Sequence, residues 1–158
     1  MRAITVPAVV ESLGPVNTLV RDLVAAAGLD PSTAYRLRLA TEELFVNIVR
    51  HGYGRRHPDG RIVVEGGLAE DRAWIRLIDR APPFDPFQAP APTELDRPLQ
   101  EREPGALGLY LTRHAVDAAS HEYVDGANRT TVVMWRGRDD DGDGWDDDGR
   151  DDTDREWV

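Results

Sequence analysis

The sequence has 158 residues, of which 41% are hydrophobic, and this is enough to form one globular domain with a core of its own. Cysteine and lysine are both absent, which excludes disulfides, thiolate chemistry, a Walker A phosphate-binding loop and Schiff-base catalysis. Residues 139–158 carry −9 of the net charge of −10, so the nearly neutral remainder lacks the basic surface that nucleic acid requires.

The chain begins without the basic flank and long apolar run of a signal peptide, and no stretch approaches the ~20 apolar residues of a membrane span. We therefore expect a soluble, cytoplasmic protein with no membrane partner. Residues 3–10, AITVPAVV, predict a short strand followed by a turn. Apolar residues then recur at helical spacing from Val16 to Ala27, and Gly28 is expected to end that helix.

A second, longer helix is predicted from about Ser32 to His51, because its apolar residues keep the helical period and glycines follow it. Asp30 and Ser32 are both candidate N-caps, and Pro31 suits the first turn. The expected core stripe of this helix consists of Leu37, Ala40, Leu44 and Ile48.

Two β-rich runs, residues 61–68 (RIVVEGGL) and 72–79 (RAWIRLID), are separated by a short polar turn and predict an antiparallel hairpin. Residues 80–104 follow, with seven of the eleven prolines and no periodic apolar pattern. Long loops inside compact domains are usually functional or disordered, so we expect this one to act as a lid.

Residues 105–119, GALGLYLTRHAVDAA, return to helical spacing through Leu107, Leu111 and Val116. Two final strands, SHEYVD and NRTTVVMWR, are predicted to be joined by the intervening Gly-Ala. This order of elements predicts an α+β fold, a two-layer α/β sandwich with a mostly antiparallel sheet and helices on one face.

The predicted domain spans residues 1–138, and residues 139–158 form an acidic tail that should be disordered because it has little to bury and repels itself. Asp139, Asp141 and Asp143 match the start of an EF-hand calcium loop, but Arg150 stands where the bidentate glutamate belongs. A solvated acidic tail is the favoured interpretation.

One edge of the long helix carries polar side chains beside the core stripe. Glu43, Asn47 and His51 are spaced four residues apart, so they lie along the same edge. A solvated helix face would explain this pattern as well as a functional edge does, and the spacing alone does not decide between them.

Asp79 ends a strand in which Ala73, Ile75 and Leu77 fall on the same side by alternation. If that side faces the core, the carboxylate is carried to the edge of the core and needs a hydrogen-bond partner. The partner is either a ligand amine or the backbone of the loop that follows the strand.

Gly105 and Gly108 open the third predicted helix directly after the long loop. Glycines let the backbone approach a ligand closely, and free amides at a helix start bind phosphate oxygens. Turn geometry alone would explain the same glycines.

The order of these features resembles the GHKL ATPase superfamily with its Bergerat ATP-binding fold. Within that superfamily, the sequence is similar to the anti-sigma regulatory factor branch of bacterial serine/threonine kinases. The segments that carry the likeness are EELFVNIVRHGY, IDRAPPFDP, GALGLYLTRHAVD and DGANRTTV, and together the matching region spans most of residues 1–136.

The resemblance implies a role for each feature. Glu43 would be the general base that accepts the proton of a protein hydroxyl, with Glu42 as an alternative. Asn47 would bind Mg²⁺, and Asp79 would accept a hydrogen bond from the adenine amino group of ATP. His51 matches the family pattern, but we expect it to make only a structural contact.

The resemblance also implies nucleotide contacts from the start of the third helix, formed by Gly105, Ala106, Leu107 and Gly108, and from Thr131 beside the adenine. Two positions depart from the family pattern, because Ala81 and Ala106 stand where glycines are usual. An added methyl can obstruct close backbone approach to a nucleotide.

The resemblance therefore implies a kinase that phosphorylates a small, STAS-type antagonist protein and regulates a sigma factor by partner switching, with a homodimer as a further expectation. One alternative is a degenerate nucleotide-binding module that acts only by protein binding, which Ala81 and Ala106 favour. Another is the ATPase domain of a histidine kinase, although no phospho-accepting helix precedes the domain in this sequence.

Overall fold

The structure is a computed structural model that describes residues 1–54, 59–88 and 106–136. In chain order the elements are strand β1 (Arg2–Pro7), the 3-10 turn η1 (Val10–Ser12), helices α1 (Leu13–Ala27) and α2 (Pro31–Asn47), the π-helical segment η2 (Ile48–Tyr53), strands β2 (Arg61–Leu68) and β3 (Arg72–Asp79), helix α3 (Ala106–Ala115), and strands β4 (Ala118–Val124) and β5 (Ala127–Trp135). The strands form one sheet in the order β1-β2-β3-β5-β4, and every neighbouring pair is antiparallel.

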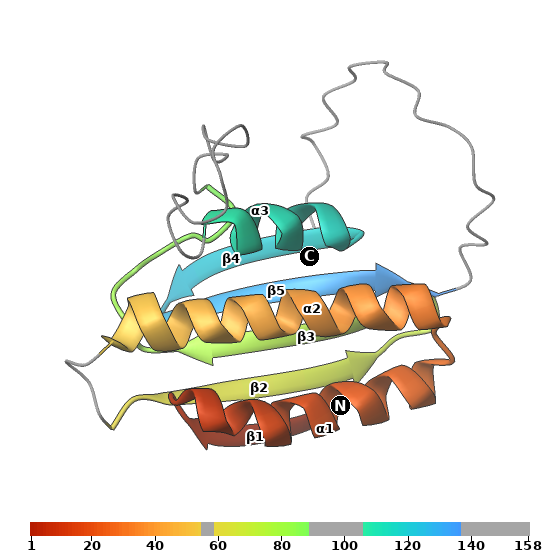
Figure 1. Ribbon diagram of the computed structural model, residues 1–158, viewed down its shortest axis with the longest axis horizontal. Coiled ribbons are helices and arrows are strands. Elements are labelled where there is room, and N and C mark those ends of the chain that lie inside the picture. Colours follow the sequence, from red (N-terminus) through yellow and green to blue (C-terminus); the bar gives the residue numbers. More distant parts are fainter. Residues whose placement is uncertain (55–58, 89–105, 137–158) are drawn as a thin grey trace, which may run out of the picture.

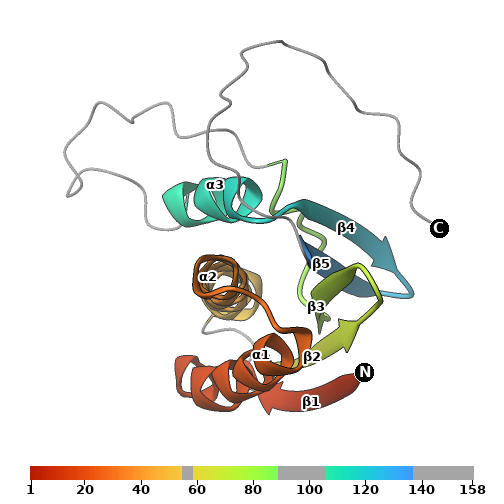
Figure 2. The ribbon, with the colours of Figure 1, turned by 90° about the vertical axis from the view of Figure 1, so that its right-hand side faces the viewer.

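All three helices lie on one face of this sheet, with α2 between α1 and α3 (Figures 1 and 2). The predicted α+β two-layer sandwich is thereby confirmed. The predicted tail, residues 139–158, lies outside the described part of the chain, and so does the predicted lid beyond residue 88. Among the described residues, no helix combines the length and the hydropathy needed to cross a bilayer.

The core forms where the helices meet the sheet. Alternation along β3 buries Ala73, Ile75, Leu77 and Asp79 on the side that faces the helices, as the sequence predicts. The apolar stripe of α2 is buried against this side, and its predicted members Leu37, Ala40, Leu44 and Ile48 are all in the core. The end of β3 is therefore held under the C-terminal half of α2.

Local sequence signals set the end of α1 and the start of α2. The Asp30 carboxylate accepts hydrogen bonds from the backbone N–H groups of Ser32 (2.8 Å) and Thr33 (3.0 Å), which makes Asp30 the N-cap of α2, with Pro31 as its first residue. Gly28 ends α1 in the left-handed conformation, with φ of 64°. Asp30 is thus the cap among the two candidates.

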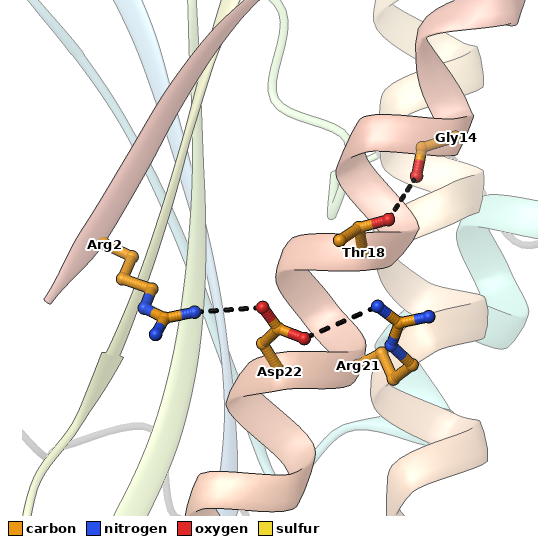
Figure 3. Close-up of polar contacts among 5 residues, drawn as sticks. All are labelled: Arg2, Gly14, Thr18, Arg21 and Asp22. Carbon is orange, nitrogen blue, oxygen red and sulfur yellow. Dashed lines mark hydrogen bonds and ion pairs between the residues drawn. The ribbon is translucent and has the colours of Figure 1, made fainter.

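The edge strand β1 is tied to α1 by an ion pair (Figure 3). A guanidinium nitrogen of Arg2 lies 2.9 Å from the Asp22 carboxylate, and Arg21 approaches the other carboxylate oxygen at 3.6 Å. These side chains are largely exposed, so each pair contributes at most about 1 kcal/mol to stability. Only the Arg2–Asp22 pair joins the strand to the helix, since Arg21 and Asp22 both belong to α1.

The third helix ends earlier than its sequence pattern predicts. Residues Ala118 and Ala119 belong to β4 instead of the helix, because Asp117 is already bound to β5. Its backbone N–H donates to the Val133 carbonyl (3.1 Å), and its carboxylate accepts from the Trp135 N–H (2.7 Å). Leu111, which was expected on the apolar face of this helix, is exposed.

The hairpin between β4 and β5 turns through Asp125 and Gly126 instead of the predicted Gly-Ala pair. Both residues have positive φ, 54° and 71°, which matches a two-residue type I′ turn. Ala127 is consequently the first residue of β5.

The long helix changes its winding before the predicted end. Regular α-helix stops at Asn47, and η2 continues as π-helix to Tyr53, which is buried. The Tyr53 hydroxyl accepts from the Arg80 backbone N–H (2.8 Å) and donates to the Arg61 carbonyl (2.9 Å). This side chain therefore holds the widened helix end against the start of β2 and the end of β3. Single π-helical turns are frequent at functional sites.

We predict that Tyr53→Phe lowers the free energy of unfolding by about 1–3 kcal/mol, because it leaves the partly buried Arg80 N–H and Arg61 carbonyl without their hydroxyl partner. Urea denaturation followed by circular dichroism measures this loss. Tyr35→Phe is the matched control, since Tyr35 is 55% exposed. Equal stability of the two variants would contradict the bridging role of Tyr53.

Candidate functional site

A cavity of about 220 Å³ lies between α2, η2, the segment that follows β3, and β5. Its apolar lining includes Leu44, Ile48 and several prolines. Its polar lining comes from Asn47, His51, Asp79, Asn128 and Thr130. Pockets that bury whole drug-sized ligands have about 300–1,000 Å³, so this cavity suits one flat ring system with the rest of a ligand outside.

Asp79 supplies the only carboxylate in the described lining of this cavity and is 3% exposed. One of its oxygens accepts hydrogen bonds from the Ala81 N–H and from the Asn128 amide, both at 2.9 Å. Burial raises the pKa of the Asp79 carboxyl, while these two hydrogen bonds and the nearby His121 act in the opposite direction. A ligand N–H group is a suitable partner for the other oxygen.

Ala81, one of the two departures from the family pattern, lies in the wall of the cavity and is buried. Its methyl group lies beside Gly52 of η2, since a Cβ atom added at Gly52 would be only 3.0 Å from the Ala81 Cβ. The space for the methyl is therefore provided by the absence of a side chain at Gly52.

Asn47 lines the cavity, whereas Glu43 lies one turn earlier on α2 and outside the lining. The Glu43 carboxylate rests against Gly108 of α3, where an added methyl would overlap it. Within the described residues, neither side chain makes a hydrogen bond. Together they lead from the cavity towards the start of α3.

Glu42, the alternative general base, faces a different neighbour. Its carboxylate accepts a hydrogen bond from the Asn17 amide of α1 (2.8 Å) and lies 3.8 Å from Arg38. This contact between helices gives Glu42 a structural role and leaves Glu43 as the carboxylate directed at α3.

The structure places the threonines of β5 differently from the sequence interpretation. Thr131 lies on the face of the sheet away from the helices, where its hydroxyl accepts from the Arg76 side chain (3.0 Å). Thr130 is buried and lines the cavity instead. Thr131 therefore does not line this cavity, because adjacent residues of a strand face opposite sides of the sheet. The buried apolar neighbours Val132 and Met134 carry the signal that identifies the correct face.

His51, Gly52 and Asn128 also line the cavity and were not among the ligand contacts expected from the sequence. His51, for which we expected only a structural contact, borders the cavity. The predicted nucleotide contact Gly105 lies outside the described residues. Ala106 and Leu107 begin α3, and of these two only the backbone is described.

The described residues contain no cluster of three or more carboxylate, histidine or cysteine side chains that would hold a metal alone. Mg²⁺ usually binds one or two protein oxygens and completes its shell with phosphate and water. The amide oxygen of Asn47 and the carboxylate of Glu43 are hard ligands of this type.

Comparison with known proteins identifies the relatives of this fold. The family described as "Histidine kinase-like ATPase domain" matches residues 6–136. The chain belongs to this family. The match runs from β1 to the end of β5, so it covers the cavity and all the elements that form it. The resemblance to the GHKL superfamily is thereby confirmed.

Within the histidine kinase-like ATPase family, the chain is 34% identical to serine/threonine-protein kinase BtrW of Bordetella bronchiseptica over 101 residues, which is 63% of this chain and 68% of that protein. It is 29% identical to serine-protein kinase RsbW of Listeria innocua over 115 residues, 71% of each. A crystal structure of the RsbU and RsbW domains of a Mycobacterium tuberculosis protein superposes with a TM-score of 0.57 at 21% identity. The superposition covers 85% of this chain and 32% of the longer Mycobacterium tuberculosis chain. At this identity it supports the fold alone.

We predict that Gly52→Ala lowers the free energy of unfolding by about 1–3 kcal/mol, because the new methyl collides with Ala81. The backbone of Gly52 is not in the left-handed region, so the collision alone should decide the effect. Adding Ala81→Gly to this variant should restore much of the loss, and a double-mutant cycle in urea measures the coupling. Simple additivity of the two changes would contradict the paired contact.

We also predict that Asp79→Asn leaves thermal stability at pH 7 equal to or above that of the wild type. Because burial raises the pKa of Asp79, this group favours folding when protonated, and that contribution is lost as pH rises through its folded pKa. The advantage of the variant should shrink as pH falls towards the ordinary aspartate pKa. Melting curves of both proteins from pH 7 downwards test this. The prediction is contradicted if the melting temperature of the variant, relative to that of the wild type, rises as pH falls.

Proposed function

We propose that this chain is an ATP-dependent serine/threonine protein kinase of the anti-sigma-factor type. The names of the relatives BtrW and RsbW support a protein kinase. The observation that carries the proposal is the buried Asp79 carboxylate in the wall of a cavity sized for a flat ring, with Asn47 and Glu43 leading out of it.

The nucleobase would occupy the cavity. A carboxylate accepts hydrogen bonds, so Asp79 selects a ring that carries an amino group, as adenine does. The apolar side chains Leu44 and Ile48 of α2 and η2 and the proline-rich segment after β3 would contact the two sides of the base. Thr130 would supply a hydroxyl group from the β5 side of the cavity.

The phosphates would extend along the edge of α2 towards α3. Backbone amides at the start of a helix suit phosphate oxygens, and the missing side chain of Gly108 lets the Glu43 carboxylate lie directly against α3. Asn47 would hold Mg²⁺ together with those oxygens, and the ion would neutralise phosphate charge.

Glu43 would act as the general base of the transfer. Its carboxylate would accept the proton of a serine or threonine hydroxyl while the hydroxyl oxygen bonds to the γ-phosphorus and the bond to ADP breaks. A general base of this kind must lie near the terminal phosphate and away from the nucleobase, and Glu43 lies outside the cavity in the direction of α3.

The substrate would be a small antagonist protein of STAS type, and the same chain would alternately bind a sigma factor, so that phosphorylation switches partners. Action in the cytoplasm and a homodimeric state belong to the same proposal.

A specific observation favours a second candidate, a module that binds nucleotide and partners without phosphoryl transfer. The Glu43 carboxylate is packed against Gly108 instead of facing open space. If this contact persists with nucleotide bound, no hydroxyl reaches the base. Kinase assays therefore have to accompany binding assays.

We predict micromolar binding of Mg-ATP by titration calorimetry, and loss of that binding in Asp79→Asn, which replaces an acceptor with a donor facing the adenine amino group. Glu43→Gln should keep ATP binding and lose phosphate transfer to a STAS-domain protein, followed with γ-labelled ATP. No binding at millimolar ATP would overturn the proposal. Binding without transfer in the wild type would support the second candidate.

A further inference from the structure

Asn128 occupies a central position beside the cavity without being a predicted site residue. It is the second residue of β5, is 3% exposed, and is the direct cross-strand neighbour of Asp79 in the pairing of β3 with β5. On its other side it pairs with Tyr123 of β4. A buried amide in this position must satisfy both its donor and its acceptor group.

The hydrogen bonds of Asn128 fix the orientation of its amide. The backbone N–H of Phe84 can only donate, so the oxygen of Asn128 faces it, at 3.1 Å. The amide nitrogen faces three oxygens that can only accept, the Asp79 carboxylate (2.9 Å) and the carbonyls of Ala81 (3.1 Å) and Pro82 (3.3 Å). Turning the amide over would replace every one of these contacts with a repulsive one.

The same oxygen also lies 3.2 Å from Nε2 of His121 on the edge strand β4. Because the Asn128 oxygen accepts, Nε2 of His121 carries a hydrogen in this arrangement. Asn128 thereby connects the end of β3, the segment after it and β4 through one side chain.

These contacts give the two oxygens of the Asp79 carboxylate different roles. One oxygen is held by Asn128 and by the Ala81 N–H, so the other is left for a ligand. They also bind the beginning of the predicted lid to the sheet through Ala81, Pro82 and Phe84. This segment lines the cavity, and its attachment makes it a fixed wall instead of part of a moving cover.

We propose that Asn128 is the positioning residue of the nucleotide site, which orients Asp79 for recognition of the 6-amino group of adenine and fixes residues 81–84 as a wall of the cavity. The orientation of Asp79 towards adenine rests on the proposed nucleotide binding. The fixing of residues 81–84 can be tested in the ligand-free protein.

Loss of Asn128 should reduce the discrimination between amino and oxo purines. The amide stabilises the charged carboxylate, so its removal raises the pKa of Asp79 and increases the fraction that donates instead of accepting. The other titratable groups around Asp79 are His121 of β4 and His51 and Tyr53 of η2, and all three remain in the variant. The acid limb of ATP binding should therefore move to higher pH.

The test compares Asn128→Leu, which keeps the branching of the side chain at Cγ but removes its polar atoms, with Arg129→Leu. Arg129 is the neighbour of Asn128 on the opposite face of β5 and pairs with the exposed Glu122. Calorimetry with ATP and with inosine triphosphate gives the ratio of affinities, and hydrogen exchange gives the protection of the Ala81 and Phe84 amides without ligand. We expect Asn128→Leu to lower the ratio of ATP affinity to inosine triphosphate affinity about tenfold. Exchange of the Ala81 and Phe84 amides should become faster by at least about tenfold, and each tenfold change corresponds to about 1.4 kcal/mol. Arg129→Leu should change neither.

An unchanged affinity ratio together with unchanged amide protection would overturn the proposal, because a side chain that only fills space predicts this result. If wild-type protein binds neither nucleotide, the proposed function fails, while the exchange data still decide whether Asn128 fixes the wall. Should Asn128→Leu not fold, Asn128→Ser provides the second variant, and it is expected to show the same changes at a lower amplitude.

Discussion

A carboxylate that is 3% exposed has to be surrounded by hydrogen-bond donors, and the donors around Asp79 come from parts of the chain that are far apart in sequence. The Ala81 N–H is two residues away, and the Asn128 amide is 49 residues away. Meeting this requirement brings the end of β3, the first residues after it and the start of β5 to one place. The cavity is the space that this arrangement leaves beneath α2 and η2. The site therefore depends on holding a carboxyl group inside the protein, and in the proposed function the adenine amino group would supply a further donor.

Features with a local physical cause could be predicted from the sequence. The stripe of α2, the cap at Asp30, the left-handed Gly28 and the alternation that buries Asp79 each depend on residues within a few positions of one another. Two of the features that were missed depend on distant partners. The π-helical winding of η2 accompanies the contact of the Tyr53 hydroxyl with β2 and β3, and the early end of α3 reflects the attachment of Asp117 to β5. Thr130 was missed because adjacent threonines on a strand face opposite sides of the sheet.

Of the two alanines that depart from the family pattern, Ala81 has a side chain whose packing the structure describes. Ala81 is accommodated because Gly52 lies beside its methyl group, so the change in one segment is matched by the small residue of another. The close approach in α3 occurs at Gly108, which meets the Glu43 carboxylate. A glycine is therefore required where the helices α2 and α3 come closest to the proposed base. The family pattern gives the positions where glycine is usual, and the packing shows at which of them a side chain would not fit.

The turn at Asp125 and Gly126 has a consequence for the chemistry of the cavity, although neither residue lines it. Strand β5 shows Asn128 and Thr130 to the cavity, and Arg129 and Thr131 to the opposite face. A shift of one residue in strand register exchanges the two faces, so it would direct the Arg129 guanidinium towards the cavity. The two positive φ angles select a two-residue turn and thereby fix that register. The conformational freedom of a glycine at the rim of the sheet thus determines whether the cavity presents an amide and a hydroxyl or a permanent positive charge.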